Sequence, residues 1–474
     1  MNHDKTPVLE AIDQYRRSDD YTFSLPGHRF GRGIDDRTAA VLNRSTFEAD
    51  VIMAKQAVSE AEELMADAVG ACHAVFTTCG SSISIHTAML TVTGPGKKIL
   101  VDRNVHKSVV ASLILAGAHP VWLRPCWDEE RQIAHPASAR DVEAALEREP
   151  DVSAVLMITP TEYGTGADAR RIAEACHRRG LPLLVDEAWG AHFPFHPVLP
   201  TAAIQAGADL VVQSLHKADG GLCQASMIQV GGDLVDPVDL RLRLDLITTT
   251  SPSALLYGSI DGFRRRMVIE GRGLLEEAIG RANALRDRLA ALKGLSVMDE
   301  SIIDQPGVAE WDPLKLSVDV TELGITGYQA KEWLLEQHKL TVQLGDTRRV
   351  VCSLTYSDDD VAFQRLGDAL EALATDPPAA DREAPRIPPL HEFDLEQAMP
   401  PRDAYFGETE QAADPAGRIS AEMISPYPPG VPAVLPGERF NRAVVDYLRA
   451  GVAAGMEVPD ASDPKLGTFR VVRG

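Results

Sequence analysis

Seven short apolar segments follow one another in the first half of the chain, separated by stretches with a helical pattern. They are rich in β-branched and large aliphatic residues, and they lie at 74–78, 98–102, 119–123, 154–159, 181–186, 209–215 and 225–230. The segments are apolar throughout rather than alternating, as are strands buried on both faces. Most intervals between them are long enough for a crossover helix. The pattern predicts an α/β fold with a mainly parallel, seven-stranded sheet.

The remaining sequence divides into further units. A short N-terminal helix is followed by the loop-like segment "LPGHRFGRG" and by a helix near 54–70. Beyond 250, a long helical pattern at 272–292 precedes shorter strands near 314–320 and 349–355, and a segment rich in proline and charge follows. We therefore expect an N-terminal arm and loop (1–60), a large domain (61–250), a small α+β domain (251–375), a linker (376–394) and a C-terminal domain (395–474).

Composition narrows the function classes. The 474 residues are 45% hydrophobic and carry a formal net charge of −22, which argues against nucleic-acid binding because a phosphate backbone requires a basic surface. The N-terminus is too polar for a signal peptide, and no apolar run approaches the ~20 residues that cross a bilayer. The six cysteines form neither a metal-binding nor a disulfide pattern. We expect a cytoplasmic protein without a metal, nucleic-acid or membrane partner.

Candidate chemistry lies where the predicted strands end, because ligands gather at the carboxyl ends of strands in open α/β sheets. After the first strand, Gly80, Ser81 and Ser82 lead directly into a helix. Free backbone N–H groups, the helix dipole and hydroxyl donors are what a phosphate group needs. An ordinary serine N-cap explains the same residues.

Two further strand ends carry a histidine and an aspartate. His106 follows the second strand, where its imidazole either stacks on a planar cofactor or is an ordinary residue at a helix start. Asp186 ends the fifth strand after four apolar residues, and a carboxylate there needs a cationic partner. A protonated pyridine nitrogen and a structural arginine are both suitable partners.

The sixth strand ends in "QSLHK", which contains Ser214, His216 and Lys217. A lysine that leaves a buried strand can have a lowered pKa and attack an aldehyde, although a lysine whose amine reaches solvent is the commoner case. Together, a phosphate cradle, an imidazole, a carboxylate and an amine match the phosphate, ring face, ring nitrogen and aldehyde of pyridoxal 5′-phosphate.

On long segments, the sequence resembles the ornithine/lysine/arginine decarboxylase family of pyridoxal phosphate enzymes with the aminotransferase-like (fold type I) architecture. The similar segments include "ILVDRNVHKSVVASLILAGAHPVWL", "LLVDEAWGAHFPF", "GADLVVQSLHK" and "GRISAEMISPYPPGVPAVLPGE". The chain looks like the short form, which lacks the receiver-like domain of the large acid-induced members. The resemblance implies decarboxylation of a basic amino acid, namely ornithine, lysine or arginine, and a homodimer with the active site at its interface.

The resemblance also implies roles for single residues. Lys217 is similar to the Schiff-base lysine, Asp186 to the partner of the pyridine nitrogen and His106 to the stacking histidine, and His216 or Lys217 is expected to protonate the substrate Cα. The expected cofactor-binding set comprises these four residues with Gly80, Ser81, Ser82, Ala188 and Ser214, of which Ser81, Ser82, Ser214 and His216 match phosphate-binding positions.

The substrate end of the predicted pocket needs acidic residues, and Glu438, Glu162 and Asp219 are the candidates. The sequence departs from the family pattern in the segment "ADGGLCQASM" after Lys217, at Glu162 where an aromatic residue is common, at Arg29 in place of lysine, and at Gln343 where glutamate is frequent. These departures concern the substrate rather than the cofactor. Transamination, aldol cleavage or oxidation with the same cofactor, or a non-catalytic regulatory relative, are the alternative functions.

Overall fold

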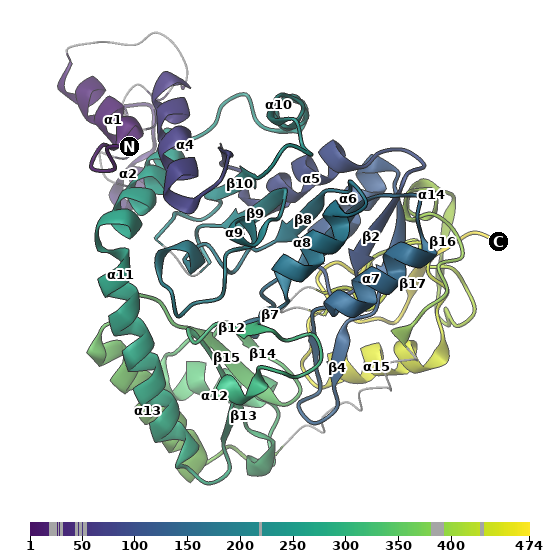
Figure 1. Cartoon of the computed structure of the whole chain (residues 1–474). Coiled ribbons are helices and arrows are strands. Elements are labelled where there is room, and N and C mark those ends of the chain that lie inside the picture. The colour runs from purple at the N-terminus through teal and green to yellow at the C-terminus, as the bar shows by residue number, and fades with distance from the viewer. Residues whose placement is uncertain are drawn as a thin grey trace.

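The structure is a computed structural model (Figure 1), and it describes residues 1–18, 26, 28, 32–42, 46, 50, 55–217, 220–380, 393–426 and 431–474. Most of the predicted loop at 25–33 and most of the predicted linker at 376–394 lie outside the described residues. Asp219 and Arg29 also lie outside them. Among the described helices, none is long and apolar enough to cross a membrane.

A seven-stranded sheet forms the centre of the large domain. In spatial order its strands are β1 (His73–Thr77), β10 (Ser226–Val230), β9 (Leu210–Ser214), β8 (Leu183–Asp186), β6 (Val152–Ile158), β2 (Lys98–Asp102) and β3 (His119–Leu123). β10 pairs antiparallel with β1 and with β9, whereas β9, β8, β6, β2 and β3 are parallel to one another. All seven predicted strands are confirmed, and so is the mainly parallel arrangement.

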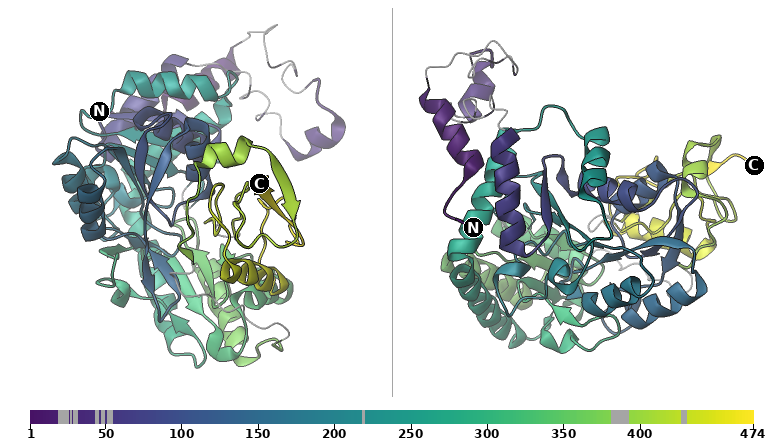
Figure 2. Two further views of the ribbon diagram at one scale, coloured as in Figure 1. Left: turned by 90° about the vertical axis from the view of Figure 1, so that its right-hand side faces the viewer. Right: turned by 45° about the horizontal axis from the view of Figure 1, so that its top comes forward.

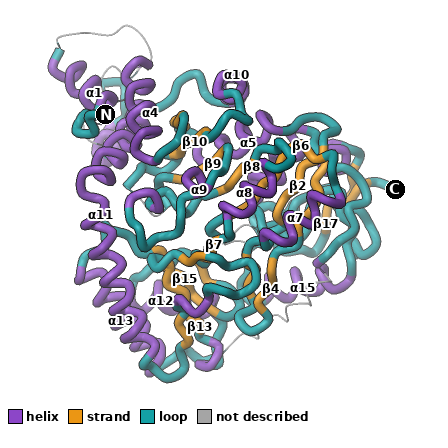
Figure 3. Tube along the Cα trace, viewed as in Figure 1, coloured by secondary structure: helices purple, strands orange, loops and turns teal. Residues whose placement is uncertain are grey.

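Both faces of this sheet are covered, which explains why its strands are apolar throughout (Figure 3). Alternate residues point to opposite sides of a strand. Thus Phe76 and Leu100 belong to one hydrophobic core, while their neighbours Val75 and Ile99 belong to the other. The helices of the large domain are α4 (Lys55–Val69), α5 (Gly80–Val92), α6 (Lys107–Ala116), α7 (Ala139–Arg148), α8 (Ala169–His177), α9 (Ala203–Ala206), α10 (Pro237–Ile247) and the 3-10 helix η1 (Phe193–Phe195).

Smaller elements complete the N-terminal and large-domain parts. The N-terminal helix α1 (Pro7–Arg17) packs on the long helix α11 (Ala254–Ala290), and the Val8 amide donates to the buried Asp261 carboxylate over 3.0 Å. Other short elements are α2 (Asp36–Val41), the hairpin of β4 (Cys126–Asp128) with β5 (Ile133–His135), and the pair of β7 (Thr165–Gly166) with β12 (Glu310–Trp311). The second pair connects the large domain to the small one.

The small domain has an antiparallel sheet of four strands, in the order β11 (Ser296–Val297), β13 (Lys315–Asp319), β15 (Arg349–Ser353) and β14 (Leu344–Gly345). Its helices are α11, α12 (Gly327–His338), α13 (Asp360–Thr375), η2 (Glu300–Ile302) and η3 (Thr321–Leu323). The two predicted strands of this region correspond to β13 and β15.

The C-terminal segment has its own hydrophobic core and lies against the large domain (Figure 2). Its elements are α14 (Pro401–Phe406), β16 (Thr409–Ala412), α15 (Arg442–Ala453) and β17 (Phe469–Val472), and β16 pairs antiparallel with β17. The indole of Trp122, on β3, donates to Gln397 over 3.2 Å. The Arg402 guanidinium donates to the Ile114 carbonyl at the end of α6 over 2.9 Å.

Candidate active site

The carboxyl ends of β1, β2, β8 and β9 lie at one edge of the large sheet, as their shared direction requires. A cavity of about 280 Å³ opens at this edge, and we call it the inner cavity. It brings together six predicted site residues, His106, Glu162, Asp186, Ala188, His216 and Lys217. Its other lining residues are Ile158, Trp189, Gln343, Leu344 and Val431.

Lys217 follows β9 in the connection to β10. Its Nζ lies over the indole of Trp189, 4.2 Å from the ring centroid, where the negative face of the ring attracts the ammonium group. Loss of hydration lowers the pKa of this amine, while the carboxylates of Asp186 and Glu162 act in the opposite direction. The structure therefore favours a more easily deprotonated, nucleophilic amine than that of an exposed lysine.

Asp186 is the last residue of β8 and is 3% exposed. Its carboxylate accepts a hydrogen bond from the Ala188 amide over 3.2 Å. Burial raises the pKa of Asp186, and the nearby Lys217 charge lowers it. A buried carboxylate of this kind is suited to bind a cationic N–H group that enters the cavity.

His106 is the N-cap of α6, because its Nδ1 accepts the Ser108 backbone N–H over 3.2 Å. An Nδ1 that accepts a hydrogen bond carries no proton, so the imidazole is neutral and its Nε2 carries the hydrogen. Burial, with the charges of Lys217 and Lys107, lowers the pKa of His106 to about 4. His106 therefore offers a neutral aromatic face to the inner cavity at physiological pH.

The predicted phosphate-binding residues gather beside this cavity but do not all line it. Gly80, with φ of +76°, begins α5, and the preceding Cys79 gives this helix no side-chain cap. The Ser214 hydroxyl at the end of β9 donates to the Ser81 hydroxyl over 2.7 Å, and Ser82 is exposed. Two strand ends thus combine hydroxyl groups with a helix N-terminus, which is an arrangement that binds phosphate.

His216 lies directly before Lys217 and lines the inner cavity. Its Nδ1 lies 3.3 Å from the Ala225 carbonyl oxygen, and because a carbonyl only accepts, Nδ1 carries the proton. Burial lowers the pKa of His216. Its Nε2 is therefore an acceptor near neutral pH.

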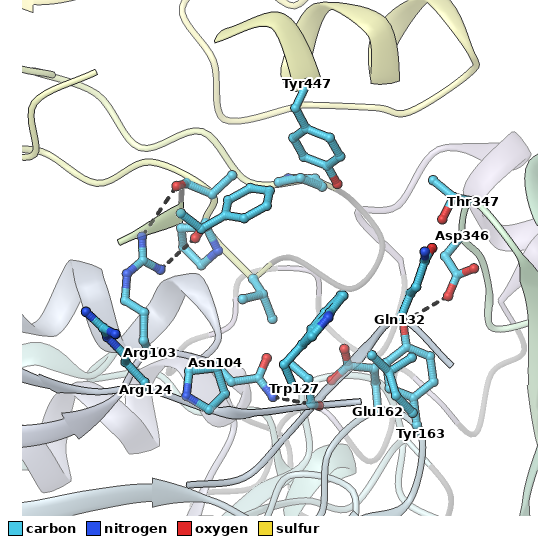
Figure 4. Close-up of a pocket in the computed structure, with 18 of the residues that line it drawn as sticks. Arg103, Asn104, Arg124, Trp127, Gln132, Glu162, Tyr163, Asp346, Thr347 and Tyr447 are labelled. Carbon is cyan, nitrogen blue, oxygen red and sulfur yellow. Dashed lines mark hydrogen bonds between the residues drawn. The ribbon is translucent and has the colours of Figure 1, made fainter. Parts of the chain in front are cut away.

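A second cavity, of about 250 Å³, adjoins the first, and we call it the outer chamber (Figure 4). Glu162 and Val431 line both spaces. Arg103 and Arg124 lie on one side of the outer chamber, and Glu162 lies on the other (Figure 4). Its aromatic residues are Trp127, Tyr163, Tyr328, Phe393 and Tyr447.

Glu438, a predicted substrate residue, is not among the lining residues of either cavity. It is 1% exposed, and its carboxylate accepts two hydrogen bonds of 3.2 Å from the Arg103 guanidinium and one of 2.9 Å from the Leu435 amide. Arg103, rather than Glu438, faces the outer chamber. The substrate role of Glu438 remains a prediction.

Sequence reasoning did not include a second lysine that lies close to Lys217. The Lys315 ammonium lies 3.7 Å from the centroid of the same Trp189 ring that Lys217 contacts. It donates to Gln343 over 3.0 Å and to Ser353 over 2.6 Å. The apolar neighbours of Lys315 in the sequence indicated only a strand, and its partners come from segments that no local pattern connects to it.

The sheet and the residues at its carboxyl edge define the aminotransferase-like, fold type I class of α/β enzymes. Solved structures agree with this class at low identity. The constitutive lysine decarboxylase of Escherichia coli has a TM-score of 0.79 at 20% identity, covering 99% of this chain and 82% of that chain. A serine palmitoyltransferase of Sphingomonas wittichii has a TM-score of 0.55 at 18% identity, and the match covers 78% of this chain and 84% of that chain.

The chain belongs to the Orn/Lys/Arg decarboxylase family. The sequence profile of the family's major domain matches residues 6–361, and that of its C-terminal domain matches residues 390–462. An arginine decarboxylase of Halalkalibacterium halodurans is 36% identical and covers 99% of this chain and 98% of its own length. An arginine decarboxylase of Bacillus subtilis is 34% identical and covers 100% of this chain and 99% of its own length. The predicted family, fold class and enzyme class, a decarboxylase, are confirmed.

Proposed function

We propose that this chain decarboxylates a basic amino acid, with arginine as the first candidate, using pyridoxal 5′-phosphate bound at Lys217. The observation that carries the proposal is the convergence of an amine, a carboxylate and a neutral imidazole, those of Lys217, Asp186 and His106, in one cavity. The family and the names of the relatives support the reaction. Two relatives more than 30% identical along nearly the whole chain are arginine decarboxylases, which supports the choice of substrate.

The residues present fit this cofactor. The Lys217 amine is suited to its aldehyde, the Asp186 carboxylate to its ring nitrogen, and the His106 imidazole to one face of the ring. Ser81 and Ser214, at the start of α5 and the end of β9, are suited to the phosphate. When bound, the cofactor supplies an electron sink for the pair of electrons released from the bond to the carboxylate.

Two residues would prepare the site for this chemistry. Asp186 would hold a proton on the ring nitrogen, since a carboxylate at this depth is stabilised by a cationic N–H partner. His106 would cover the ring face as a neutral group, because its lowered pKa keeps a positive charge away from the protonated ring.

Lys217 is the better candidate for returning a proton to the substrate Cα. The Nδ1 hydrogen of His216 is held by the Ala225 carbonyl, and its Nε2 is an acceptor, so this imidazole has no proton to give to the cavity. The Lys217 amine lies at the cavity wall and is free to carry a proton once it no longer holds the cofactor aldehyde. His216 would then position the connection between β9 and β10.

We further propose that this protein, which its composition indicates to be cytoplasmic, is a homodimer with the active site at the subunit interface, as the family resemblance implies. Light scattering on the purified protein measures this directly. A particle with twice the mass of the chain is expected, and a monomer that retains full turnover would exclude a shared site.

The proposal is tested by comparing the wild type with Lys217→Ala and with a control, Lys97→Ala, at an exposed lysine. Borohydride reduction followed by peptide mass spectrometry should find the cofactor attached to Lys217 in the wild type and in the control. Lys217→Ala should lose this attachment and all turnover. An unmodified Lys217, or normal turnover without it, would refute the proposal.

Product analysis tests the reaction type separately. With arginine as substrate, carbon dioxide and the corresponding amine are expected in equal amounts, as measured by gas release and mass spectrometry. Transamination or oxidation would give a keto product without stoichiometric carbon dioxide, and aldol cleavage would give a shorter amino acid. Any of these results would retain the cofactor assignment but reject decarboxylation.

A further inference from the structure

Glu162 and Tyr163 occupy the two central positions of a tight turn that follows β6. The Gly164 amide donates to the Thr161 carbonyl over 2.9 Å, which closes the turn, and the Thr161 amide donates to the Thr165 carbonyl over 2.9 Å. Gly164 has φ of +88°, a backbone conformation that glycine adopts without strain. The turn therefore projects two adjacent side chains, and both line the outer chamber.

The Glu162 carboxyl is placed differently from the other acidic groups of the outer chamber. Asp346 accepts a hydrogen bond from the Tyr163 hydroxyl over 3.0 Å and forms a salt bridge of 3.1 Å with the Arg349 guanidinium, while Asp394 forms a salt bridge with Arg124. Glu162 is 5% exposed, and among the described residues its own backbone N–H is the hydrogen-bond donor to its carboxyl. A buried carboxylate with a single backbone donor is costly, so this group is suited to a partner that arrives from the cavity.

The position of Glu162 indicates what that partner is. It lies where the inner cavity, which contains Lys217, meets the outer chamber. A substrate whose α-amine lies near Lys217 can extend its side chain past Glu162 into the chamber. Burial raises the pKa of Glu162 to about 7, against the lowering effects of the Lys217 and Lys315 charges, and this agrees with a carboxyl that lacks a bound cation.

We propose that Glu162 receives the cationic end of the substrate side chain, and that the outer chamber selects a planar guanidinium over an ammonium group. This inference rests on the proposed function and names the residue that sets its substrate. A guanidinium binds a carboxylate through two parallel N–H groups and stacks on aromatic rings, which a compact ammonium does not do. Trp127 and Tyr163 supply aromatic surface on the wall near Glu162 (Figure 4).

The test measures direct binding, so that it does not depend on turnover. Isothermal calorimetry compares agmatine, which has a guanidinium, with N-carbamoylputrescine, in which a neutral urea of the same shape replaces it. The wild type should bind agmatine more tightly. Glu162→Gln should reduce this preference on the order of 10- to 100-fold, as expected for the loss of a charge-assisted hydrogen bond. Glu162→Asp, which keeps the charge, should recover part of the preference.

Glu129→Gln is the matched control, because it makes the same chemical change at an exposed residue of the β4–β5 hairpin that carries Trp127. It should keep the wild-type preference. An unchanged preference in Glu162→Gln would overturn the inference, as would a wild type that binds both ligands equally. In turnover of arginine, Glu162→Gln should raise KM more than it lowers kcat, and a loss confined to kcat would also overturn it.

Failure of the proposed function gives a different result. A wild type that prefers agmatine through Glu162 but releases no carbon dioxide from arginine would reject decarboxylation and leave the guanidinium site intact. A wild type that decarboxylates arginine while Glu162→Gln keeps its ligand preference would reject only the role of Glu162.

Discussion

Replacing Arg103 with leucine should loosen the contact between the C-terminal segment and the large domain. Arg103 follows β2, and its guanidinium donates to both carboxylate oxygens of Glu438 and, over 2.7 Å, to the Pro432 carbonyl. The Glu438 side chain is almost completely buried. The substitution removes these donors and leaves a carboxylate in a dry site with one hydrogen bond, from the Leu435 amide.

The size of the expected decrease in stability follows from the protonation of Glu438. Burial already raises its pKa, and Arg103 is the main group that opposes this rise. Without Arg103 the carboxyl takes up a proton in the folded state, which at pH 7 costs up to about 3.4 kcal/mol for a group with an ordinary pKa of 4.5. The lost bond to Pro432 adds about 1 kcal/mol. Because the raised pKa of Glu438 means that the wild type already bears part of the proton cost, we expect a decrease of at most about 4 kcal/mol in the free energy of unfolding at pH 7.

The loss of stability caused by Arg103→Leu should depend on pH. The folded state of Arg103→Leu binds a proton that the unfolded state releases above pH 4.5, so its stability falls as pH rises. Above the wild-type pKa of Glu438, the difference from the wild type should grow by up to about 1.4 kcal/mol per pH unit. At pH 5 the proton costs little, and the two proteins should differ mainly by the lost hydrogen bonds.

Urea unfolding followed by tryptophan fluorescence, at pH 5.5 and pH 7.5, checks this expectation. Arg103→Leu/Glu438→Gln should be more stable than Arg103→Leu at pH 7.5, because it has no charge to bury. Arg124→Leu is the control, since its pair with Asp394 is exposed and is worth less than about 1 kcal/mol. Equal losses at both pH values, or no loss in Arg103→Leu, would refute the reasoning. If Glu438 instead contacted the substrate, Glu438→Gln would raise KM without changing stability.

Three further outcomes are expected. His106→Phe should bind the cofactor about as tightly as the wild type and His106→Ala about tenfold more weakly, in cofactor titrations, because the ring face rather than the proton carries the contact. The KM for arginine should fall as pH rises through about 7, where Glu162 ionises; the facing charges of Lys217 and Lys315 favour this ionisation, whereas burial and the charge of Asp346 oppose it. Glu162→Gln should remove this pH dependence in kcat/KM profiles. Gly164→Ala should lower the thermal midpoint more than Gly180→Ala, since both glycines have positive φ but only at Gly164 would a Cβ lie 2.8 Å from the Lys315 side chain.

The large sheet was predictable because its strands are apolar on both faces, a pattern that few other structures produce. The placement of Asp186 and Lys217 in one cavity was predictable for the same reason, since Asp186 ends β8, Lys217 lies three residues after β9, and parallel strands bring their carboxyl ends together. The antiparallel β10 follows from the short connection after β9, which leaves no room for a crossover helix.

The outer chamber was not predictable from any local pattern. Its wall combines the β4–β5 hairpin, the turn at 161–164, the region after α12 and the C-terminal segment. Each of these segments contributes aromatic or charged residues that, from the sequence alone, cannot be distinguished from ordinary surface or core residues. Glu438 shows the limit most clearly, because only the packed structure reveals that Arg103 stands between this carboxylate and the chamber.

The pair of lysines at Trp189 shows how packing, rather than sequence position, gives two neighbouring amines different surroundings. Both ammonium groups lie within 4.2 Å of the centroid of one indole ring. Hydrogen bonds to Gln343 and Ser353 hold Lys315, and the register of β13 and β15 sets Lys315 directly opposite Ser353. Lys217 is instead influenced by the charges of Asp186 and Glu162 across the cavity. Burial lowers the pKa of Lys217 against the effect of these two carboxylates, so its neutral amine, the form that attacks an aldehyde, is easier to reach than that of an exposed lysine.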